Sequence, residues 1–463
     1  MPRLPMAPDA MTTSPLLQVA NLAFTYIGQP GPTLHDVHLT LQAGELVVLA
    51  GATGSGKSTL LNCLTGIAPD HTGGRLSGQV LYRGQDITAW SMRMRSQVMG
   101  ILLQNVETQL FTDQVWEELV FGLENWNLPP GEIQALAQTA LADFDLVAQR
   151  HWPIARLSAG QKQRLLLACL LTRQPDLLLL DEPFAFLDTA GVKQLLRLLR
   201  RRVQRGQTVV LIEHRLELLQ GICDRAYRVE AGTVCPMAVS ELAAATVSLP
   251  PLTSRPRQVA RGPTTPPVLQ THGLSWGGYP AFPDLKVFPG DIVLLQGDNG
   301  CGKTTLLKLL SGLLKPSSGR IWLQGREVTG QRVVQRSQTV GFVLQNPNHQ
   351  LFADSVAAEL HQPGVAPAQA QALLQQLNLT PCRDQHPRAL SQGQKRQLAL
   401  GAVLARQPQV CLLDEIMVGQ DATSLALMLE TLKTFTDQGG ALIFTSHDGA
   451  IATALAPEII AIG

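Results

Sequence analysis

Two segments of this 463-residue chain contain the residue types that bind phosphate. Residues 51–58 and 297–304 both match the pattern G-x-x-x-x-G-K-[ST] in full. In such a loop the glycines let backbone N–H groups converge on phosphate oxygens, the lysine reaches the terminal phosphates, and the next hydroxyl faces Mg²⁺. The pattern therefore predicts two phosphate-binding loops, with Lys57 and Lys303 as their cationic side chains.

The segments on either side of each loop are of the kind that would position it. Short apolar runs at 46–50 and 292–296 predict buried strands, and helix-forming residues follow each loop. A phosphate held between strand and helix lies at the positive end of the helix dipole. A single glycine-rich loop is often an ordinary turn, whereas two full matches in the same context favour nucleotide binding. The residues predicted to contact the nucleotide here are Gly51, Thr53, Gly54, Ser55, Gly56, Lys57, Ser58, Thr59, Gly297, Asn299, Gly300, Cys301, Gly302, Lys303, Thr304 and Thr305.

Further motifs recur in the same order, which indicates that one unit has been duplicated. The segment Leu-Ser-Ala-Gly-Gln around Ser158 recurs as Leu-Ser-Gln-Gly-Gln around Ser391, with an offset of 391 − 158 = 233 positions. The two loop lysines are 303 − 57 = 246 positions apart, so the second copy is shorter between its loop and its serine motif. Three further pairs keep the offset of 233: Asp181 and Asp414, Glu182 and Glu415, and His214 and His447.

The length and this duplication predict two domains joined by a linker. Between the copies lies a Pro-rich segment of small polar residues, which favours a semi-extended linker. We expect a disordered tail at 1–15, a first domain at 16–236, a linker at 237–267 and a second domain at 268–463.

Composition narrows the classes of function. A formal net charge of +1 argues against a nucleic-acid footprint, which usually carries a basic excess. The seven cysteines form no C-x-x-C pair and no metal-ligand spacing with histidine, so we expect a reducing compartment and no structural zinc. The longest apolar runs are far shorter than the roughly 20 residues that span a bilayer. Any role at a membrane would therefore require a partner.

Adjacent acidic residues follow an apolar strand in each copy. Asp181 and Asp414 end runs of apolar residues, where a carboxylate can reach a Mg²⁺ ion. Glu182 and Glu415 come next and could hold an attacking water as general bases. Acidic residues at a strand end are more often solvent-facing caps, but the preceding leucines and the recurrence favour catalysis.

The order of these motifs, phosphate loop, glutamine, Leu-Ser-x-Gly-Gln, Asp-Glu and histidine, resembles that of the ABC-type ATPases. Nearly the whole chain except the tail and linker takes part in this resemblance. Residues 344–352, Leu-Gln-Asn-Pro-Asn-His-Gln-Leu-Phe, are similar to a segment typical of the energy-coupling-factor group of vitamin and transition-metal importers. Residues 103–111 are similar, with Val106 in place of proline, and Ile-Glu-His-Arg at 212–215 also resembles fused ATPases of that group.

The resemblance implies roles for further residues. His214 and His447 would contact the γ-phosphate, and an aromatic ring, Tyr26 in the first copy, would stack on adenine. In the second copy Trp276 or Tyr279 could replace it, with core packing as the alternative. Each Ser-x-Gly helix would close on the nucleotide of the other copy, so that two ATP molecules are sandwiched. The residues implied in this closure are Ser158, Gly160, Gln161, Ser391, Gly393 and Gln394; those implied around Mg²⁺ and water are Ser58, Gln104, Asp181, Thr304, Gln345 and Asp414.

The sequence thus predicts an α/β protein of two tandem P-loop NTPase domains, each with a helical subdomain. By resemblance it would be the ATP-hydrolysing engine of an importer, at the cytoplasmic face of the cell membrane. Its partners would be an integral coupling subunit and a substrate-binding membrane subunit. The alternative is a soluble tandem ABC protein that acts on the ribosome or on nucleic acid.

The second copy departs from the family pattern just after its acidic pair. Ile416 stands where proline is usual, and Gln420 stands where the first copy has Leu187. Both glutamates and both histidines are present. We therefore expect two unequal sites that both hydrolyse ATP.

Overall fold

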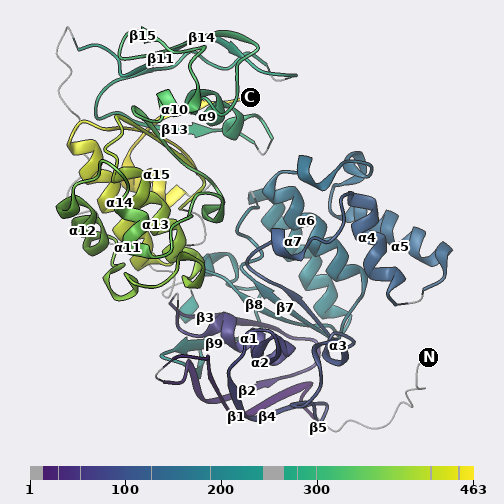
Figure 1. Ribbon diagram of the computed structural model, residues 1–463. Coiled ribbons are helices and arrows are strands. Elements are labelled where there is room, and N and C mark those ends of the chain that lie inside the picture. The colour runs from purple at the N-terminus through teal and green to yellow at the C-terminus, as the bar shows by residue number, and fades with distance from the viewer. Residues whose placement is uncertain are drawn as a thin grey trace. The chain divides into compact units, whose positions relative to one another are not determined.

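The chain folds into two compact units, Met1–Thr246 and Val247–Gly463 (Figure 1). The computed structural model describes residues 14–29, 31–52, 54–126, 128–187, 189–242, 265–278, 280–298, 300–417, 420–446 and 449–463. Both units combine sheets and helices as the sequence predicts, so the expected α/β fold class is confirmed.

The first unit contains two sheets. A six-stranded sheet has the order β10-β9-β3-β8-β7-β6 and is parallel except for β10. A four-stranded antiparallel sheet has the order β2-β1-β4-β5. The strands are β1 (Leu17–Thr25), β2 (Leu34–Leu41), β3 (Leu46–Ala50), β4 (Arg75–Tyr82), β5 (Gln85–Asp86), β6 (Met99–Leu102), β7 (Leu177–Asp181), β8 (Thr208–Ile212), β9 (Arg225–Glu230) and β10 (Thr233–Met237).

The helices of the first unit cover both faces of the six-stranded sheet. In Figure 1, α1 and α2 lie between the two sheets, and α4 to α7 lie beyond the other face. The α-helices are α1 (Lys57–Thr65), α2 (Ile67–Asp70), α3 (Met92–Arg95), α4 (Val115–Glu124), α5 (Pro130–Asp143), α6 (Ala159–Thr172) and α7 (Thr189–Gln204). The 3-10 turns are η1 (Glu107–Gln109), η2 (Val147–Gln149), η3 (Ile154–Arg156) and η4 (Leu216–Leu218).

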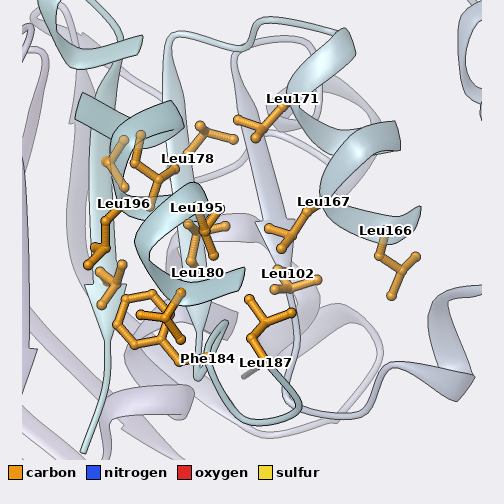
Figure 2. Packing of buried hydrophobic residues seen from close by; sticks show 14 of the residues in the cluster. Leu102, Leu166, Leu167, Leu171, Leu178, Leu180, Phe184, Leu187, Leu195 and Leu196 are labelled. Atoms are coloured by element: carbon orange, nitrogen blue, oxygen red, sulfur yellow. The ribbon is translucent and has the colours of Figure 1, made fainter. Parts of the chain in front are cut away.

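Burial on both faces explains why the central strands are continuously apolar. Successive side chains of a strand point to opposite faces. Accordingly, Val47 and Leu49 belong to the core beneath the antiparallel sheet, while Leu46 and Val48 belong to the core beneath α6 and α7. Figure 2 shows leucines of α6, β7 and α7 meeting in this second core. Each fully buried leucine stabilises the unit by about 1.5–3 kcal/mol relative to exposure.

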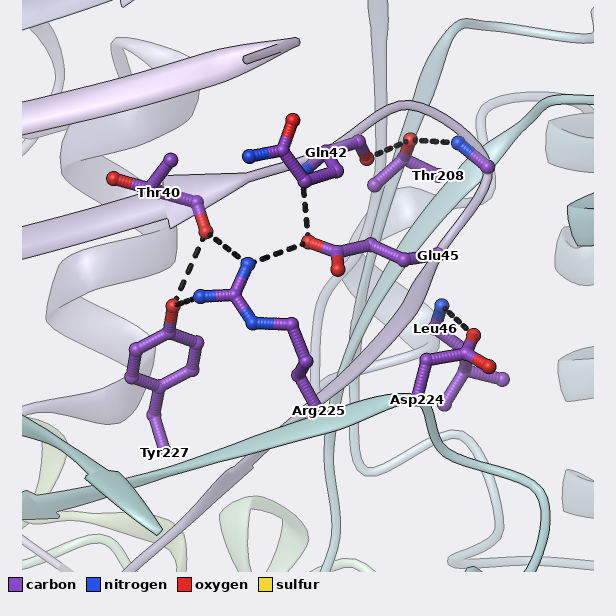
Figure 3. Close-up of polar contacts among 9 residues, drawn as sticks. Thr40, Gln42, Glu45, Leu46, Thr208, Asp224, Arg225 and Tyr227 are labelled. Atoms are coloured by element: carbon purple, nitrogen blue, oxygen red, sulfur yellow. Dashed lines mark hydrogen bonds and ion pairs between the residues drawn. The ribbon is translucent and has the colours of Figure 1, made fainter. Parts of the chain in front are cut away.

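A polar network connects the strands at the end of the sheet opposite the phosphate loop (Figure 3). Arg225 donates to the carbonyl oxygen of Thr40 at 3.0 Å and contacts the carboxylate of Glu45 at 3.3 Å. Asp224 accepts the backbone N–H of Leu46 at 2.8 Å. These bonds fix the start of β3, whose other end leads into the loop.

Among the described residues, the second unit repeats this plan with fewer strands. Its antiparallel sheet has the order β12-β11-β14-β15, and its parallel sheet has the order β16-β17-β18-β13-β19. The strands are β11 (Leu269–Ser275), β12 (Lys286–Val287), β13 (Ile292–Gln296), β14 (Ser318–Leu323), β15 (Arg326–Glu327), β16 (Val340–Val343), β17 (Val410–Asp414), β18 (Ala441–Thr445) and β19 (Glu458–Ala461). The helices are α9 (Lys303–Ser311), α10 (Val333–Arg336), α11 (Val356–Leu360), α12 (Pro367–Gln376), α13 (Gln392–Leu404), α14 (Ala422–Asp437) and α15 (Gly449–Leu455), with 3-10 turns η5 (Pro347–His349), η6 (Thr380–Cys382) and η7 (Pro387–Ala389).

The two units differ in the lengths of their helices, and the first unit ends later than the sequence predicts. The helix α11 has 5 residues where α4 has 10, and α12 has 10 where α5 has 14. Of the 246 − 233 = 13 missing residues, 54 − 46 = 8 are lost in this helical part, between Gln345 and Ser391. The first unit also extends further than the expected boundary at residue 236. Met237 and Leu242 are buried in its core, whereas residues 243–264 of the expected linker and residues 1–13 of the expected tail lie outside the described residues.

Candidate nucleotide and hydrolysis sites

The two phosphate loops have the same backbone plan. The helices α1 and α9 begin at Lys57 and Lys303, and the preceding Gly56 and Gly302 have φ of 107° and 106°, in the left-handed region that favours glycine. Lys57 Nζ donates to the carbonyl oxygens of Gly51 and Ala52, both at 2.7 Å. In the second loop Nζ donates to the carbonyl oxygens of residues 297 and 298, at 2.7 and 3.0 Å. Each ammonium group therefore lies directly over its loop.

A close backbone approach explains the first glycine of each loop. A Cβ atom on Gly51 would lie 2.2 Å from the carbonyl oxygen of Val229, and one on Gly297 would lie 2.2 Å from that of Ile462. Any side chain would push the loop away from the neighbouring strand. The predicted contacts Thr53 and Asn299 lie outside the described residues. Cys301 is half-buried, and its sulfur lies beside Gly297.

The acidic pair of the first unit lies where β7 ends. Asp181 is buried, and within the described part of the chain its Oδ1 has no hydrogen-bond partner. Burial, followed by the charge of Glu182, raises the pKa of Asp181 to about 7, against the opposing effects of the Ser58 hydrogen bond and of Lys57. A buried carboxylate oxygen and a hydroxyl are hard oxygen donors of the kind that Mg²⁺ prefers. These residues therefore fit a Mg²⁺ ion.

Glu182 meets His214 across the ends of two adjacent strands. His214 Nε2 lies 3.2 Å from Glu182 Oε1, and the Glu182 N–H donates to the carbonyl oxygen of Ile212 at 2.9 Å. Glu182 has a φ of 53°, which is uncommon for a residue other than glycine. Burial lowers the pKa of His214, but the hydrogen bond and charge of Glu182 outweigh it and raise the pKa above its usual value. Gln104 follows β6 and is half-buried.

The second unit has the same strand ends but different hydrogen bonds. Asp414 Oδ1 accepts from the hydroxyls of Thr304 and Thr445, both at 3.1 Å. Burial and the charge of Glu415 raise the pKa of Asp414 to about 6. Gln345 Nε2 donates to Glu415 Oε2 at 3.0 Å, and Glu415 has a φ of 50°. His447 lies outside the described residues.

The Ser-x-Gly motifs begin helices α6 and α13 with matching caps. Ser158 Oγ accepts the N–H of Gln161 at 3.2 Å, and Gln161 Oε1 accepts the N–H of Ser158 at 2.9 Å. Ser391 and Gln394 form the same capping box, at 3.2 and 3.0 Å. Gly160 and Gly393, two residues after each serine, are buried. The predicted role of these residues toward ATP stays a prediction, and the structure assigns them a local role in starting the helix.

The predicted adenine-stacking residues that the structure describes, Tyr26 and Trp276, both contact residues of their own unit. Tyr26 is half-buried, its hydroxyl lies 3.2 Å from Thr59 Oγ1, and its ring meets Phe24 edge-on at 4.8 Å. Trp276 packs against the core of the second unit, as the packing alternative proposed. Tyr279 lies outside the described residues.

A pair of buried glutamates, which the motif analysis did not single out, organises the glutamine segments. Glu118 Oε2 accepts the N–H groups of Phe111 and Thr112 at 3.0 and 2.8 Å. Glu359 Oε2 accepts those of Phe352 and Ala353, both at 2.8 Å. The sequence did contain a signal, because each glutamate follows its segment's first glutamine, Gln104 or Gln345, at the same spacing.

These bonds hold each segment so that its phenylalanine projects outward. Phe111 is 75% exposed and Phe352 is 81% exposed. Phe121 on α4 is 44% exposed, and its ring centroid lies 6.1 Å from that of Phe111. Each unit therefore displays an apolar side chain on a segment that its own hydrogen bonds hold in place.

Comparison with known proteins identifies what the chain resembles. The family model for ABC transporters matches residues 34–185 and 283–418. A protein of Methanosarcina acetivorans, provisionally named an ABC transporter ATP-binding protein, is 32% identical to this chain. The alignment covers 97% of this chain and 84% of that protein. A protein of Bacillus subtilis, provisionally named HMP/thiamine import ATP-binding protein YkoD, is 32% identical over 96% of this chain and 89% of its own.

A solved structure supports the fold independently. A chain in a model of ribosome-bound archaeal Pelota and ABCE1 is similar to this chain, with a TM-score of 0.69 and 19% sequence identity. The similarity covers 95% of this chain and 76% of that chain. At that identity the likeness concerns the fold alone. In the part of the chain that the structure describes, no helix combines the length and apolarity needed to cross a bilayer.

Proposed function

This chain belongs to the ABC transporter family, and from that premise we propose that it is the ATP-hydrolysing subunit of an importer of the energy-coupling-factor type. Membership of the family makes the chain an ATPase that uses ATP with Mg²⁺. The importer type, the partners and the location at the cytoplasmic face of the membrane are the further parts of the proposal. The observation that carries it is the pair of exposed phenylalanines in the glutamine segments.

Each unit contributes one set of hydrolysis residues in this proposal. Ser58 and Asp181 in the first unit, and Thr304 and Asp414 in the second, would hold Mg²⁺. When bound, Mg²⁺ would supply positive charge against the negative charge that develops on the phosphate oxygens. The loop lysine would hold the β- and γ-phosphates. Such charge-assisted contacts act in a largely buried site, where they are stronger than in water.

The attacking water would be placed by the glutamate that follows the aspartate. Glu182 would accept its proton, while His214, which lies 3.2 Å from Glu182, would contact the γ-phosphate. In the second unit Glu415 would take this role, with Gln345 donating to it at 3.0 Å. Most of the rate enhancement would come from position and charge, because phosphoryl transfer needs little covalent chemistry from the protein.

ATP binding would be converted into movement by closure of the duplicated units. We propose that each Ser-x-Gly helix, at Ser158 or Ser391, completes the nucleotide site whose phosphate loop lies in the other unit. Charge-assisted hydrogen bonds contribute roughly 1.5–3 kcal/mol each. One such contact per site would favour closure by about 3–6 kcal/mol, enough to reverse a two-state equilibrium. Loss of the γ-phosphate would reopen it.

The glutamine segments are the proposed contact with an integral coupling subunit. Gln104 and Gln345 begin these segments, and Phe111 and Phe352 end them as exposed apolar side chains. Buried Glu118 and Glu359 fix the backbone beside each phenylalanine. Side chains of Gln109 and Gln350 bond the backbone just before Gln104 and Gln345, so a displaced segment would move the glutamine and the phenylalanine together. The segment would thus couple hydrolysis to a partner. A Bacillus subtilis relative named for HMP/thiamine import supports the importer class, while the cargo would be selected by a separate substrate-binding subunit.

Affinity purification from detergent-solubilised membranes tests the proposal. We expect the tagged chain to recover a polytopic membrane protein, identified by mass spectrometry. Replacing Phe111 and Phe352 together with Ser should reduce its recovery about tenfold, because two apolar anchors are lost. Val147 and Val334, which are 61% and 73% exposed, provide a matched control when both are replaced with Ser.

Two results would reject the importer role. One is recovery of the membrane protein to the same extent from the phenylalanine and valine variants. The other is co-sedimentation with ribosomes in the absence of a membrane partner, which would favour the alternative of a soluble tandem ABC protein.

A further inference from the structure

Glu213 is a buried carboxylate that the reaction described above does not use. It follows β8 directly and is only 5% exposed. Its Oε1 accepts the backbone N–H of Phe184 at 2.7 Å, and its Oε2 accepts the backbone N–H of His214 at 3.1 Å. One carboxylate therefore bonds the two segments that carry hydrolysis residues, the turn after Glu182 and the loop that contains His214.

The turn that Glu213 bonds contains an unfavourable backbone conformation at Glu182. Glu182 has a φ of 53°, and a non-glycine residue in this region costs on the order of 1–3 kcal/mol unless its surroundings impose it. On the other side of the turn, Gln163 of α6 donates to the carbonyl oxygen of Pro183 at 2.6 Å. Arg215 donates to the carbonyl oxygen of the residue after Pro183. Bonds from the segment after β8 and from α6 thus converge on the backbone next to Glu182.

The equivalent position in the second unit is Ser446, at the common offset of 233 (446 − 213 = 233). A serine side chain is two carbons shorter than that of glutamate and has one oxygen, so it cannot reach two separate N–H groups as Glu213 does. The second unit holds its glutamate in another way. Thr445 Oγ1 accepts the N–H of Glu415 at 3.0 Å, a bond that the Ile212 carbonyl oxygen accepts in the first unit.

We propose that Glu213 is a positioning residue of the first hydrolysis centre, whose carboxylate keeps Glu182 and His214 in their 3.2 Å contact. The second centre relies on Thr445 instead. Glu213 touches neither phosphate nor water in this role, and it acts through the backbone of the two residues that do.

The surroundings of Glu213 explain why both oxygens are engaged. The charged and titratable groups that face it are Arg215, Glu182 and His214. Burial raises the pKa of Glu213 to about 7, Arg215 opposes this rise, and Glu182 adds to it. A carboxylate so poorly solvated is stable only with hydrogen-bond donors, and the two N–H groups supply them.

A double-mutant cycle in the full-length chain tests this role. Glu213→Ser gives the first unit the residue of the second, and Glu213→Gln keeps one acceptor. Each is combined with Glu415→Gln, so that the remaining ATP hydrolysis comes from the first centre. Each is also combined with Glu182→Gln, so that the remaining hydrolysis comes from the second centre. Steady-state ATP hydrolysis gives kcat and KM, and Glu241→Gln, an exposed glutamate of the same unit, serves as the control.

We expect Glu213→Ser to lower kcat about tenfold in the Glu415→Gln background and less than twofold in the Glu182→Gln background. The KM for ATP should stay within about twofold, and Glu213→Gln should restore kcat to within about threefold. Equal loss of kcat in both backgrounds would overturn the proposal, as would a raised KM with unchanged kcat. If Glu213→Ser fails to fold by circular dichroism, Glu213→Gln decides: a kcat equal to that of Glu241→Gln in the Glu415→Gln background overturns the proposal.

Discussion

The two candidate hydrolysis centres share a backbone frame and differ in the side chains that hold it. In both units a buried aspartate ends a central strand, and the next residue is a glutamate with a φ near 50°. Around that frame, Glu213 corresponds to Ser446, Ile212 to Thr445, and Leu187 to Gln420. The reacting groups are therefore set by strand ends that duplication preserved. The hydrogen bonds that orient them have diverged, which gives a physical basis for unequal sites.

Removing the glutamates one at a time should produce the largest effect. Loss of a general base typically costs about 10²- to 10⁴-fold in rate, so Glu182→Gln and Glu415→Gln should each reduce turnover at their own centre by that order. We expect Glu182→Gln to leave the lower residual ATPase activity, because the first centre has the more regular turn. Steady-state hydrolysis by the two purified variants measures this. Identical residual activities would show that the centres are equal.

The pH dependence of stability should separate the units next. Because the folded-state pKa of Glu213 is raised from 4.5 to about 7, the folded protein keeps a proton between these values that the unfolded chain has released. The contribution of Glu213 to the free energy of unfolding should therefore fall as pH rises from about 4.5 to about 7, by on the order of 3 kcal/mol, and then level off. Asp181 and Asp414, whose pKa values are also raised, add declines of the same sign. The second unit has Ser446 at this position and contributes no such decline there.

Denaturant unfolding at about pH 5 and about pH 7.5 measures this difference. Glu213→Gln has no carboxyl group to titrate, so the decline should shrink in that variant. Glu241→Gln should keep the full decline, since Glu241 is exposed. An unchanged decline in Glu213→Gln would assign the pH dependence to other groups.

Exchanging Leu187 and Gln420 should have the smallest effect, with opposite signs in the two units. Gln420 is 6% exposed, and neither polar atom of its side chain has a hydrogen-bond partner among the described residues. Leaving buried polar groups unbonded costs about 1–3 kcal/mol, so Gln420→Leu should stabilise the protein by that amount. Leu187→Gln should destabilise it by a similar amount. Thermal unfolding of both variants checks the signs, and a less stable Gln420→Leu would contradict this account.

Much of the site could be predicted from residue order alone. Lys57 and Asp181 were located by a pattern and by a strand end, since both features depend on local chain geometry. The adenine contact of Tyr26 stays a prediction, and the structure adds that Tyr26 bonds Thr59 and packs edge-on against Phe24. Whether an aromatic residue faces a ligand or the core depends on neighbours that are distant in sequence.

The first domain boundary shows the same limit. Pro-rich composition suggested an end at residue 236, yet Met237 and Leu242 are buried with residues of the first unit. Burial depends on what a side chain meets after folding. Composition reports only the preference of the local segment.

The sequence by itself determined the duplication, the α/β class and the two phosphate loops, because these follow from short patterns with a fixed spacing. Only the tertiary structure decided which groups touch. In the folded protein Glu182 contacts His214, and Gln345 donates to Glu415. The carboxylate of Glu213 accepts two backbone N–H groups. The physical reason is that parallel strands bring their carboxyl ends together whatever their separation along the chain. The contacts made there depend on side chains from several strands at once.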